Sequence, residues 1–419
     1  MQLLPFAVIL FLASLGLPIF IVMSALALVA FSLGGTEVSA VIVELYRIAS
    51  APTLLTIPLF TLAGYVMAES KSPVRLLRLA QAALGWMPGG VAIVGLVISA
   101  FFTAFTGASG VTIIAIGGLL YPIMQKEGYT EKFNLGMITT CGSLGLLFPP
   151  SLPIILYGLV AKVDIDRLFK AGIVPGIILI VILSLWAIYN GNSSGTKQKF
   201  VWKELKDSLI GARFELPLPI FVLGGIYGGF TTASEASAIT LFYVIIIECF
   251  LYRDVSLFKD MPRIVGESMT LVGAILLILC CALGMTNYLV DEEVPMKILD
   301  LMRHYIDSKL MFLLFLNLFL LIVGCLMDIF SAIIVVVPLI LPIAQEFHVD
   351  PIHLAIIFLT NLEIGYITPP VGINLFISSF RFNKPVTTLY KASFPFLILM
   401  LIALAIITYI PSLTLFWFK

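Results

Sequence analysis

The sequence has few charged residues. Of its 419 residues only 24 are Lys or Arg and 24 are Asp or Glu, so charged residues make up 11% of the chain and the formal net charge is zero. A soluble protein would carry about twice that share. The sequence contains no basic tract, so a nucleic-acid partner has no electrostatic support. Hydrophobic residues make up 60%, and several uncharged runs exceed about 18 residues, which predicts a polytopic protein of the lipid bilayer.

Cysteine and histidine are also scarce. The five cysteines lie in apolar runs without metal-ligand spacing and are interpreted as small hydrophobic residues: Cys141, Cys249, Cys280, Cys281 and Cys325. The three histidines lie at the edges of apolar segments and form no cluster, so no transition-metal site is expected. An intramembrane enzyme would need paired acids, a Ser-Lys pair or a His-Glu zinc site at membrane depth. The sequence shows none of these patterns, and we predict that the chain is not an enzyme.

The most informative feature is a repeated motif. Residues 142–153 read GSLGLLFPPSLP and residues 362–373 read LEIGYITPPVGI. An offset of 220 residues places Gly145 on Gly365, and the Pro-Pro pair of 149–150 on that of 369–370. After one inserted residue, the LFKA of 168–171 matches the LYKA of 389–392. A constant offset indicates an internal repeat.

Apolar segments of spanning length are predicted in both halves: about 4–33, 52–69, 133–161, 171–190, 214–230, 234–252, 267–290, 354–380 and 392–417. The first is interpreted as a retained helix, because it lacks a basic n-region and exceeds the length of a signal peptide. Two further stretches, about 90–125 and 310–345, have small or polar centres at Thr106–Gly110 and Gly324–Asp328. One helix of that length would measure about 50 Å against a core of about 30 Å. We therefore predict two re-entrant hairpins, which must be buried in protein or line a cavity.

The distribution of basic residues predicts the topology. With a cytoplasmic N-terminus, the inner segments would hold 16 of the 24 Lys and Arg, as the positive-inside rule requires. The first hairpin then opens to the cytoplasm and the second to the outside. We predict an all-α polytopic protein with two inverted-topology repeats, 1–190 and 214–419, joined by a cytoplasmic linker at 191–213. The broken helices would be 133–161 and 354–380. This is the architecture of a secondary transporter.

Proline removes a backbone donor and clashes with the preceding helical turn, so the two Pro-Pro pairs must break their helices. Each break frees carbonyls, which suit a dehydrated cation, and amides, which suit a carboxylate. Hydroxyl groups close to the breaks can complete a coordination shell: Thr103, Thr106, Ser109 and Thr368. We predict two sodium sites, one in each half. The alternative is that the breaks serve helix packing alone.

Four acidic residues lie within apolar segments, and each is a functional candidate because a buried charge is expensive. Asp328 can ligate a cation or cap the amides of its turn. Glu363 can contact an ion, pack, or accept backbone hydrogen bonds. Glu235 is interpreted as the third residue of a capped helix, and Glu248 as interfacial or paired with a neighbouring helix. No Lys or Arg lies in a spanning core, so an organic anion would be held by helix ends, hydroxyls, Asn374 and the bound cation.

The amino-acid sequences of these motifs resemble those of one protein family. IPLFTLAG at 57–64, GSLGLLFPPSLPIILYG at 142–158, LFKAGIVPG at 168–176 and NLEIGYITPPVGINLF at 361–376 are similar to the large membrane subunit of tripartite ATP-independent periplasmic (TRAP) transporters. The TASEA of 232–236 has Ala233 where the family usually has proline. The first hairpin centre, TGASGVT, departs from the family's more usual pair of serines.

The resemblance implies the import of an organic acid anion, such as a C4-dicarboxylate, sialic acid or another sugar acid, across the bacterial inner membrane. It also implies a sodium gradient, a small four-helix membrane subunit, an extracytoplasmic substrate-binding protein and an elevator-type movement. The alternative is a stand-alone sodium-coupled carboxylate carrier. Carried over by position, the implied sodium ligands are Thr103, Thr106, Gly145, Phe148 and Pro150 in the first half, and Gly324, Gly365, Thr368 and Val371 in the second. The substrate candidates are Ser109, Asp328 and Asn374, and the helix breaks are Pro149, Pro150, Pro369 and Pro370.

Overall fold

The computed structural model describes residues 19–34, 52–191, 200–303 and 308–418, together with Val8, Ile9, Phe11, Leu17, Val43 and Ile306. All regular secondary structure within these residues is helical. Of the predicted first span, 4–33, the part from Ile19 forms helix α2 (Ile19–Gly34). Residues 192–199 of the predicted linker lie outside the described residues.

The first half of the chain continues with these elements: η1 (Pro52–Leu55), α4 (Thr56–Glu69), α5 (Ser72–Leu84), α6 (Gly90–Thr106), α7 (Ser109–Lys126), α8 (Glu131–Cys141), η2 (Leu144–Leu147), α9 (Leu152–Ala161) and α10 (Ile165–Gly191). The second half contains α11 (Trp202–Gly211), α12 (Pro217–Tyr227), α13 (Ala233–Ile245), η3 (Ile246–Leu251), α14 (Met261–Asp291), α15 (Val294–Arg303), α16 (Lys309–Leu326), α17 (Ile329–Glu346), α18 (Pro351–Gly365), α19 (Ile373–Phe382), α20 (Val386–Tyr409), η4 (Pro411–Leu413) and η5 (Phe416–Phe418).

The element bounds follow the sequence repeat. Adding 220 to the bounds of α7, 109–126, gives 329–346, which are the bounds of α17. Adding 221 to those of α9, 152–161, gives 373–382, the bounds of α19. The order of two helices from a predicted hairpin range, an interrupted helix and a long helix therefore occurs twice. The shift from 220 to 221 reflects the inserted residue in the second break.

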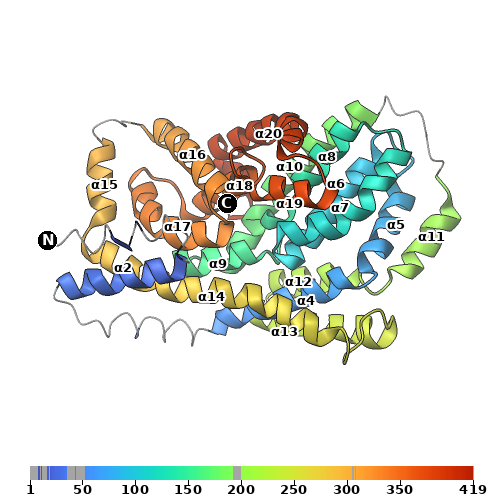
Figure 1. Cartoon of the computed structure of the whole chain (residues 1–419), viewed down its shortest axis with the longest axis horizontal. Helices are drawn as coiled ribbons and strands as arrows, with labels where there is room; N and C mark the ends of the chain where they lie inside the picture. The colour runs from blue at the N-terminus through green and yellow to red at the C-terminus, as the bar shows by residue number, and fades with distance from the viewer. Residues whose placement is uncertain are drawn as a thin grey trace.

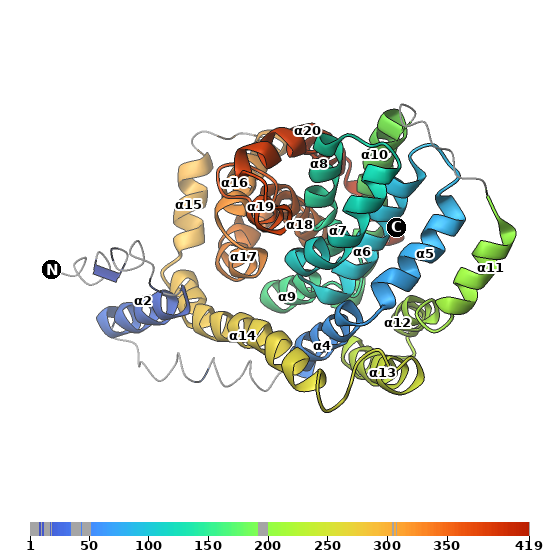
Figure 2. The same ribbon diagram turned by 45° about the vertical axis from the view of Figure 1, so that its right-hand side comes forward.

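The helices form two groups (Figure 1). α14, α4 and α13 run along one side with α2, and each contacts the next in the row. The helices of the 90–125 and 310–345 stretches, the broken helices, α10 and α20 gather on the other side, with α5 and α15 at opposite ends (Figure 2). α4 touches α6, and α14 touches α17, so the row contacts both groups of hairpin helices.

The two predicted hairpin ranges contain paired helices with different turns. α6 packs against α7, and the turn between them uses Gly107 with φ of 64°, a left-handed conformation that glycine adopts without a Cβ penalty. α16 ends at Leu326, Met327 after it is extended, and α17 begins after Asp328. α16 packs chiefly on α18, whereas α17 packs on α9 and α14.

Fewer helices than predicted have spanning length. Six described helices are long and apolar enough to cross a membrane, or seven if the bent pair of 131–147 and 152–161 forms one span. The predicted spans at 52–69 and 214–230 contain α4 and α12, with 14 and 11 residues. Helices of that length measure about 21 and 17 Å, short of the hydrocarbon core. The count includes α16 and α17, which the sequence assigns to the second hairpin.

Candidate functional site

The first helix break is enclosed by protein. α8 and α9 meet at a bend of 45°, and the Pro149–Pro150 peptide bond between them is cis. Thr103 Oγ lies 2.8 Å from Gly142 O and 2.8 Å from Thr112 Oγ. A Cβ added to Gly145 would lie 2.2 Å from Ala100 O, so only glycine permits this close approach of η2 to α6.

The sequence-predicted residues of the first sodium site come together around this turn. Thr103, Thr106, Gly145 and Pro150 are buried, and Phe148 is half-buried against Gly176. Ser151, which the sequence analysis did not single out, adds a fully buried hydroxyl at the start of α9 that has no hydrogen-bond partner among the described residues. An unpaired buried oxygen beside freed carbonyls fits a hard, dehydrated cation.

The second helix break has the same motif but a more open setting. The Pro369–Pro370 bond is cis, as in the first break. A Cβ on Gly365 would lie 2.3 Å from the carbonyl carbon of Gly324, so the break touches the tip of the second pair of hairpin helices directly. Thr368 Oγ donates to Ile364 O at 2.8 Å. Pro369, Pro370 and Val371 are exposed, Val371 by 38%.

The two halves meet through a hydrogen bond between two predicted substrate residues. Ser109 Oγ donates to Asn374 Oδ1 at 2.7 Å, and Asn374 Nδ2 donates to Thr139 O at 3.2 Å. Ser109 begins α7 and Asn374 is the second residue of α19, so two helix N-termini converge here. Neither N-cap residue, Ala108 or Gly372, caps its helix with a side chain. The amides of both ends therefore present positive potential at one place.

The structure shows what two of the acidic residues contact. Asp328 caps α17, because Oδ1 accepts from Phe330 N at 3.0 Å and from Ser331 N at 3.1 Å. Its Oδ2 accepts from the hydroxyl of Ser331, and a direct role for Asp328 in holding substrate stays a prediction. Glu235 forms a capping box with Thr232, which confirms the structural interpretation.

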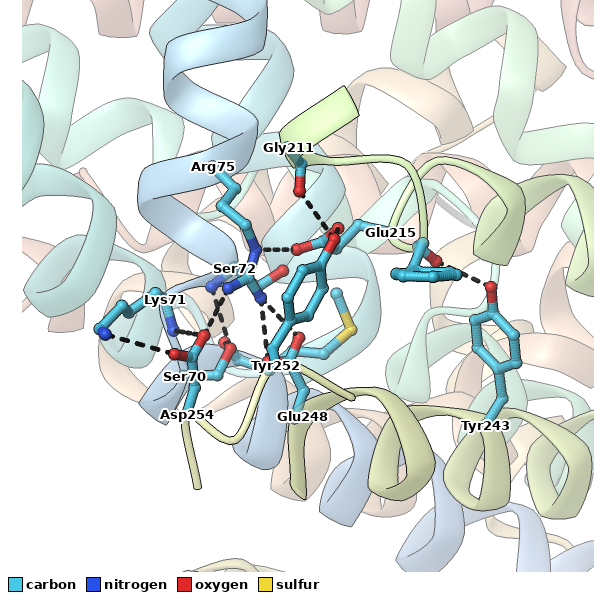
Figure 3. A network of polar contacts seen from close by, with 12 residues as sticks. Ser70, Lys71, Ser72, Arg75, Gly211, Glu215, Tyr243, Glu248, Tyr252 and Asp254 are labelled. Atoms are coloured by element: carbon cyan, nitrogen blue, oxygen red, sulfur yellow. Dashed lines mark hydrogen bonds and ion pairs between the residues drawn. The ribbon is translucent and has the colours of Figure 1, made fainter. Parts of the chain in front are cut away.

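Glu248 is paired, which was one of its two alternatives, and its partner Arg75 was not expected from the sequence. Arg75 on α5 contacts three carboxylates from separate segments, those of Glu215, Glu248 and Asp254 (Figure 3). Its guanidinium also lies 3.8 Å from the ring centroid of Tyr252. Burial alone would lower the pKa of Arg75, but the hydrogen bonds to Asp254 and Glu215, together with the negative charges of Glu248 and Glu215, outweigh it and raise the pKa. The cluster therefore connects α5 to Glu215, just before α12, and to Glu248 and Asp254, which follow α13.

Comparison with known proteins places these features in a family. The sequence model of the family described as "Tripartite ATP-independent periplasmic transporter, DctM component" matches residues 6–413. The chain is 34% identical to the "C4-dicarboxylate TRAP transporter large permease protein DctM" of Pseudomonas aeruginosa, over 90% of this chain and 89% of that protein.

Two other similarities extend the comparison. The "Isethionate TRAP transporter permease protein DctMQ" of Oleidesulfovibrio alaskensis is 36% identical over 87% of this chain, which spans 58% of that relative's length. Among solved structures, "Crystal structure of the Alcanivorax borkumensis YdaH transporter reveals an unusual topology" aligns with a TM-score of 0.63, covering 89% of this chain and 88% of that chain. At 12% identity, this likeness shows the fold.

Proposed function

The chain belongs to the DctM family of tripartite ATP-independent periplasmic transporter components, and from this premise we propose that it imports an organic acid anion with sodium. It is a transporter permease rather than an enzyme, as its relatives are named. We propose that it works with a small membrane subunit and an extracytoplasmic binding protein in the bacterial inner membrane.

The convergence of α7 and α19 carries the proposal for the anion. Both helix N-termini are free of capping side chains, and Ser109 and Asn374 from different halves lie within a hydrogen bond of each other. The first amides of α7 and the second Nδ2 hydrogen of Asn374 can donate to a carboxylate without a Lys or Arg at the site, and Ser109 could join them if its hydroxyl turned from Asn374 to the anion. The site therefore suits an acid that arrives with its own cation.

The two breaks carry the proposal for sodium. Each offers backbone carbonyls beside a helix turn, with Thr103 at the first and Thr368 at the second. Positive charge bound at both breaks would offset the charge of the anion between them. This arrangement couples the two ligands, because either one bound alone leaves an uncompensated charge in a low-dielectric site.

The names of the relatives support the proposed substrate class. Proteins of similar sequence are named for C4-dicarboxylates, isethionate, 2,3-diketo-L-gulonate and ectoine. We propose that this chain recognises the acidic group common to such compounds and that the rest of the molecule is selected by the binding protein. Movement of the group containing the hairpin and broken helices against the row of α2, α14, α4 and α13, in the manner of an elevator, would alternate access.

The test is reconstitution. Proteoliposomes containing the chain with the small subunit and the binding protein of the same gene cluster are supplied with radiolabelled succinate, isethionate, 2,3-diketo-L-gulonate or ectoine. We expect accumulation of one of them that requires an inward sodium gradient and the binding protein. Equal uptake with a potassium gradient would refute sodium coupling. Uptake without any binding protein would instead support the stand-alone carrier.

A further inference from the structure

The two predicted hairpin ranges differ in how closely their paired helices pack. α6 packs along α7, whereas α16 and α17 have little contact with each other. Between α16 and α17 lies a cavity of about 450 Å³, bordered by α15, which contacts α17 (Figure 2). The residues that line the cavity are all Phe, Leu, Ile or Val. Its volume falls within the range of about 300–1,000 Å³ that is usual for ligand pockets.

The sequence repeat accounts for the wider spacing of the second pair. Under the 220-residue offset, Gly95 of α6 corresponds to Phe315 of α16, and Ser99 corresponds to Phe319. A Cβ on Gly95 would lie 2.8 Å from Leu120 Cδ1, so the close packing of α6 on α7 depends on a glycine. The two phenyl rings at the equivalent positions of α16 line the cavity instead. Large side chains therefore hold α16 away from α17 along the middle of the pair.

The two helices are connected at both ends of the cavity. Phe312, in the first turn of α16, stacks on Phe347, which follows α17, with ring centroids 4.5 Å apart and planes inclined by 9°. At the same end Lys309 Nζ donates to His348 O at 2.6 Å. At the other end the short turn before α17 joins the helices directly. The cavity is therefore a gap enclosed within a connected pair of helices.

The surroundings of the cavity determine the chemistry of its occupant. An apolar lining offers water no hydrogen bond, and an empty space deprives the lining of dispersion contacts, so a hydrocarbon is favoured. Phe315 and Phe319 are 45% and 46% exposed, so the cavity reaches the exposed face of α16 that also carries Leu314 and Leu318. α16 is long and apolar enough to cross a membrane. In a membrane permease, that exposed face lies against lipid acyl chains.

We propose that the cavity between α16 and α17 binds one acyl chain of a membrane phospholipid. The acyl chain enters from the exposed face of α16, beside Phe315 and Phe319, and lies against Val336 and Ile340 of α17. It takes the place of the direct helix contact that Gly95 allows in the first pair. The spacing of the second pair then depends on the bilayer, whereas that of the first pair is set by protein alone. This inference does not depend on the sodium coupling proposed above.

The experiment maps where lipid contacts the protein. The chain and the small membrane subunit of the same gene cluster are reconstituted in vesicles of phosphatidylethanolamine and phosphatidylglycerol. The vesicles contain a phosphatidylethanolamine with a photoactivatable diazirine on one acyl chain, and adducts are located by peptide mass spectrometry after illumination. We expect adducts on Leu316, Val336 or Ile340, which line the cavity and are buried. Adducts on Leu314 and Leu318 are expected in any case, because both side chains are exposed.

Leu339→Trp and Leu318→Trp form a matched pair of variants. Leu339 lines the cavity, whereas Leu318 is on the exposed face of α16. The indole at position 339 should fill the cavity, so that an acyl chain would have to displace it. We therefore expect adducts on Val336 and Ile340 to fall about tenfold in Leu339→Trp. Leu318→Trp adds the same bulk outside the cavity and should leave these adducts unchanged.

Three outcomes would overturn the proposal. The first is a wild-type protein whose adducts are confined to exposed residues of α16. The second is equal labelling of the cavity residues in Leu339→Trp and in the wild type. The third is labelling of the cavity only when the small subunit is left out, since that subunit would then be the occupant. Should Leu339→Trp fail to fold, Ile340→Phe fills the cavity from the next position, and loss of the adducts on Leu316 and Val336 decides the question.

Discussion

The two Pro-Pro breaks share a sequence motif but not an environment. The first is covered on several sides, since η2 packs against α6, α10 and α18, and both of its prolines are buried. The second rests on the tip between α16 and α17, where Gly372 N donates to Cys325 O at 3.2 Å. Its prolines and Val371 are exposed.

The same Pro-Pro motif therefore forms a turn that is buried in the first half, called closed here, and a turn that is exposed in the second half, called open. At the first break the freed carbonyls can be satisfied only by protein or by a dehydrated ion, whereas at the second they can reach solvent. We therefore expect an ion at the second break to exchange more readily. The three predictions that follow change residues at the two breaks and at the turns that face them, and compare the results.

The largest effect is expected from adding a methyl group at the paired glycines. In Gly145→Ala the new Cβ meets the backbone of α6, and in Gly365→Ala it meets the backbone of Gly324. Both variants should lose uptake. Gly145→Ala should also destabilise the fold by about 1–3 kcal/mol, because α6 is fixed in the core, whereas Gly365→Ala should displace an open tip and lower the melting temperature less.

Gly273→Ala on α14 is the control, because a Cβ there has no described neighbour within 4 Å. Equal melting temperatures for the two glycine variants would contradict the contrast between a closed and an open break.

A smaller effect is expected at one threonine hydroxyl beside each break, Thr103 and Thr368, which do not correspond under the 220-residue offset. Thr103→Val removes an oxygen that lies between Gly142 O and Thr112 Oγ in a buried position, and should cost about 1–3 kcal/mol by leaving polar atoms unpaired. Thr368→Ala removes a hydrogen bond to Ile364 O, in the last turn of α18. It should change stability by less than about 1 kcal/mol but should raise the half-saturating sodium concentration. Thermal unfolding and sodium titration of uptake measure both quantities, and an unchanged sodium dependence in Thr368→Ala would remove the second site from the proposal.

Much of this arrangement follows from the sequence because a repeat constrains two regions at once. The 220-residue offset located both breaks, and the small or polar centres at Thr106–Gly110 and Gly324–Asp328 located the turns between paired helices. Asn374 and Ser109 were selected for their chemistry, and the structure places them in contact. Helix lengths were less predictable, because α4 and α12 are apolar but end after 14 and 11 residues.

The contacts that the sequence did not reveal are those between segments distant along the chain. Arg75 contacts the carboxylates of Glu215, Glu248 and Asp254, which lie at least 140 residues further along the chain. No local sequence pattern around Arg75 indicates these partners. The contact of Ser143 with Glu363 was implicit in the repeat. Positions of equal register near both breaks were the signal available, since Ser143 and Glu363 correspond under the 220-residue offset.

The smallest effect is expected at the N-cap positions of α7 and α17, which carry different residues. Asp328 caps α17, while the equivalent end of α7 begins after Ala108, which has no capping side chain. Ala108→Asp would add a cap worth about 1 kcal/mol, and it would place a carboxylate over the amides proposed to hold the substrate. We expect a slightly higher melting temperature and a KM for the transported anion raised by about fivefold or more, with sodium dependence unchanged.

Ala108→Asn separates the two contributions of that cap, since it can accept the same amide hydrogen bonds without a negative charge. It should raise KM less than Ala108→Asp does, because the amides are occupied but the anion is not repelled. A higher melting temperature with an unchanged KM in both variants would mean that the end of α7 forms no part of the anion site. The uncapped helix would then differ from α17 for structural reasons alone, and the anion would have to be held by α19 and Asn374.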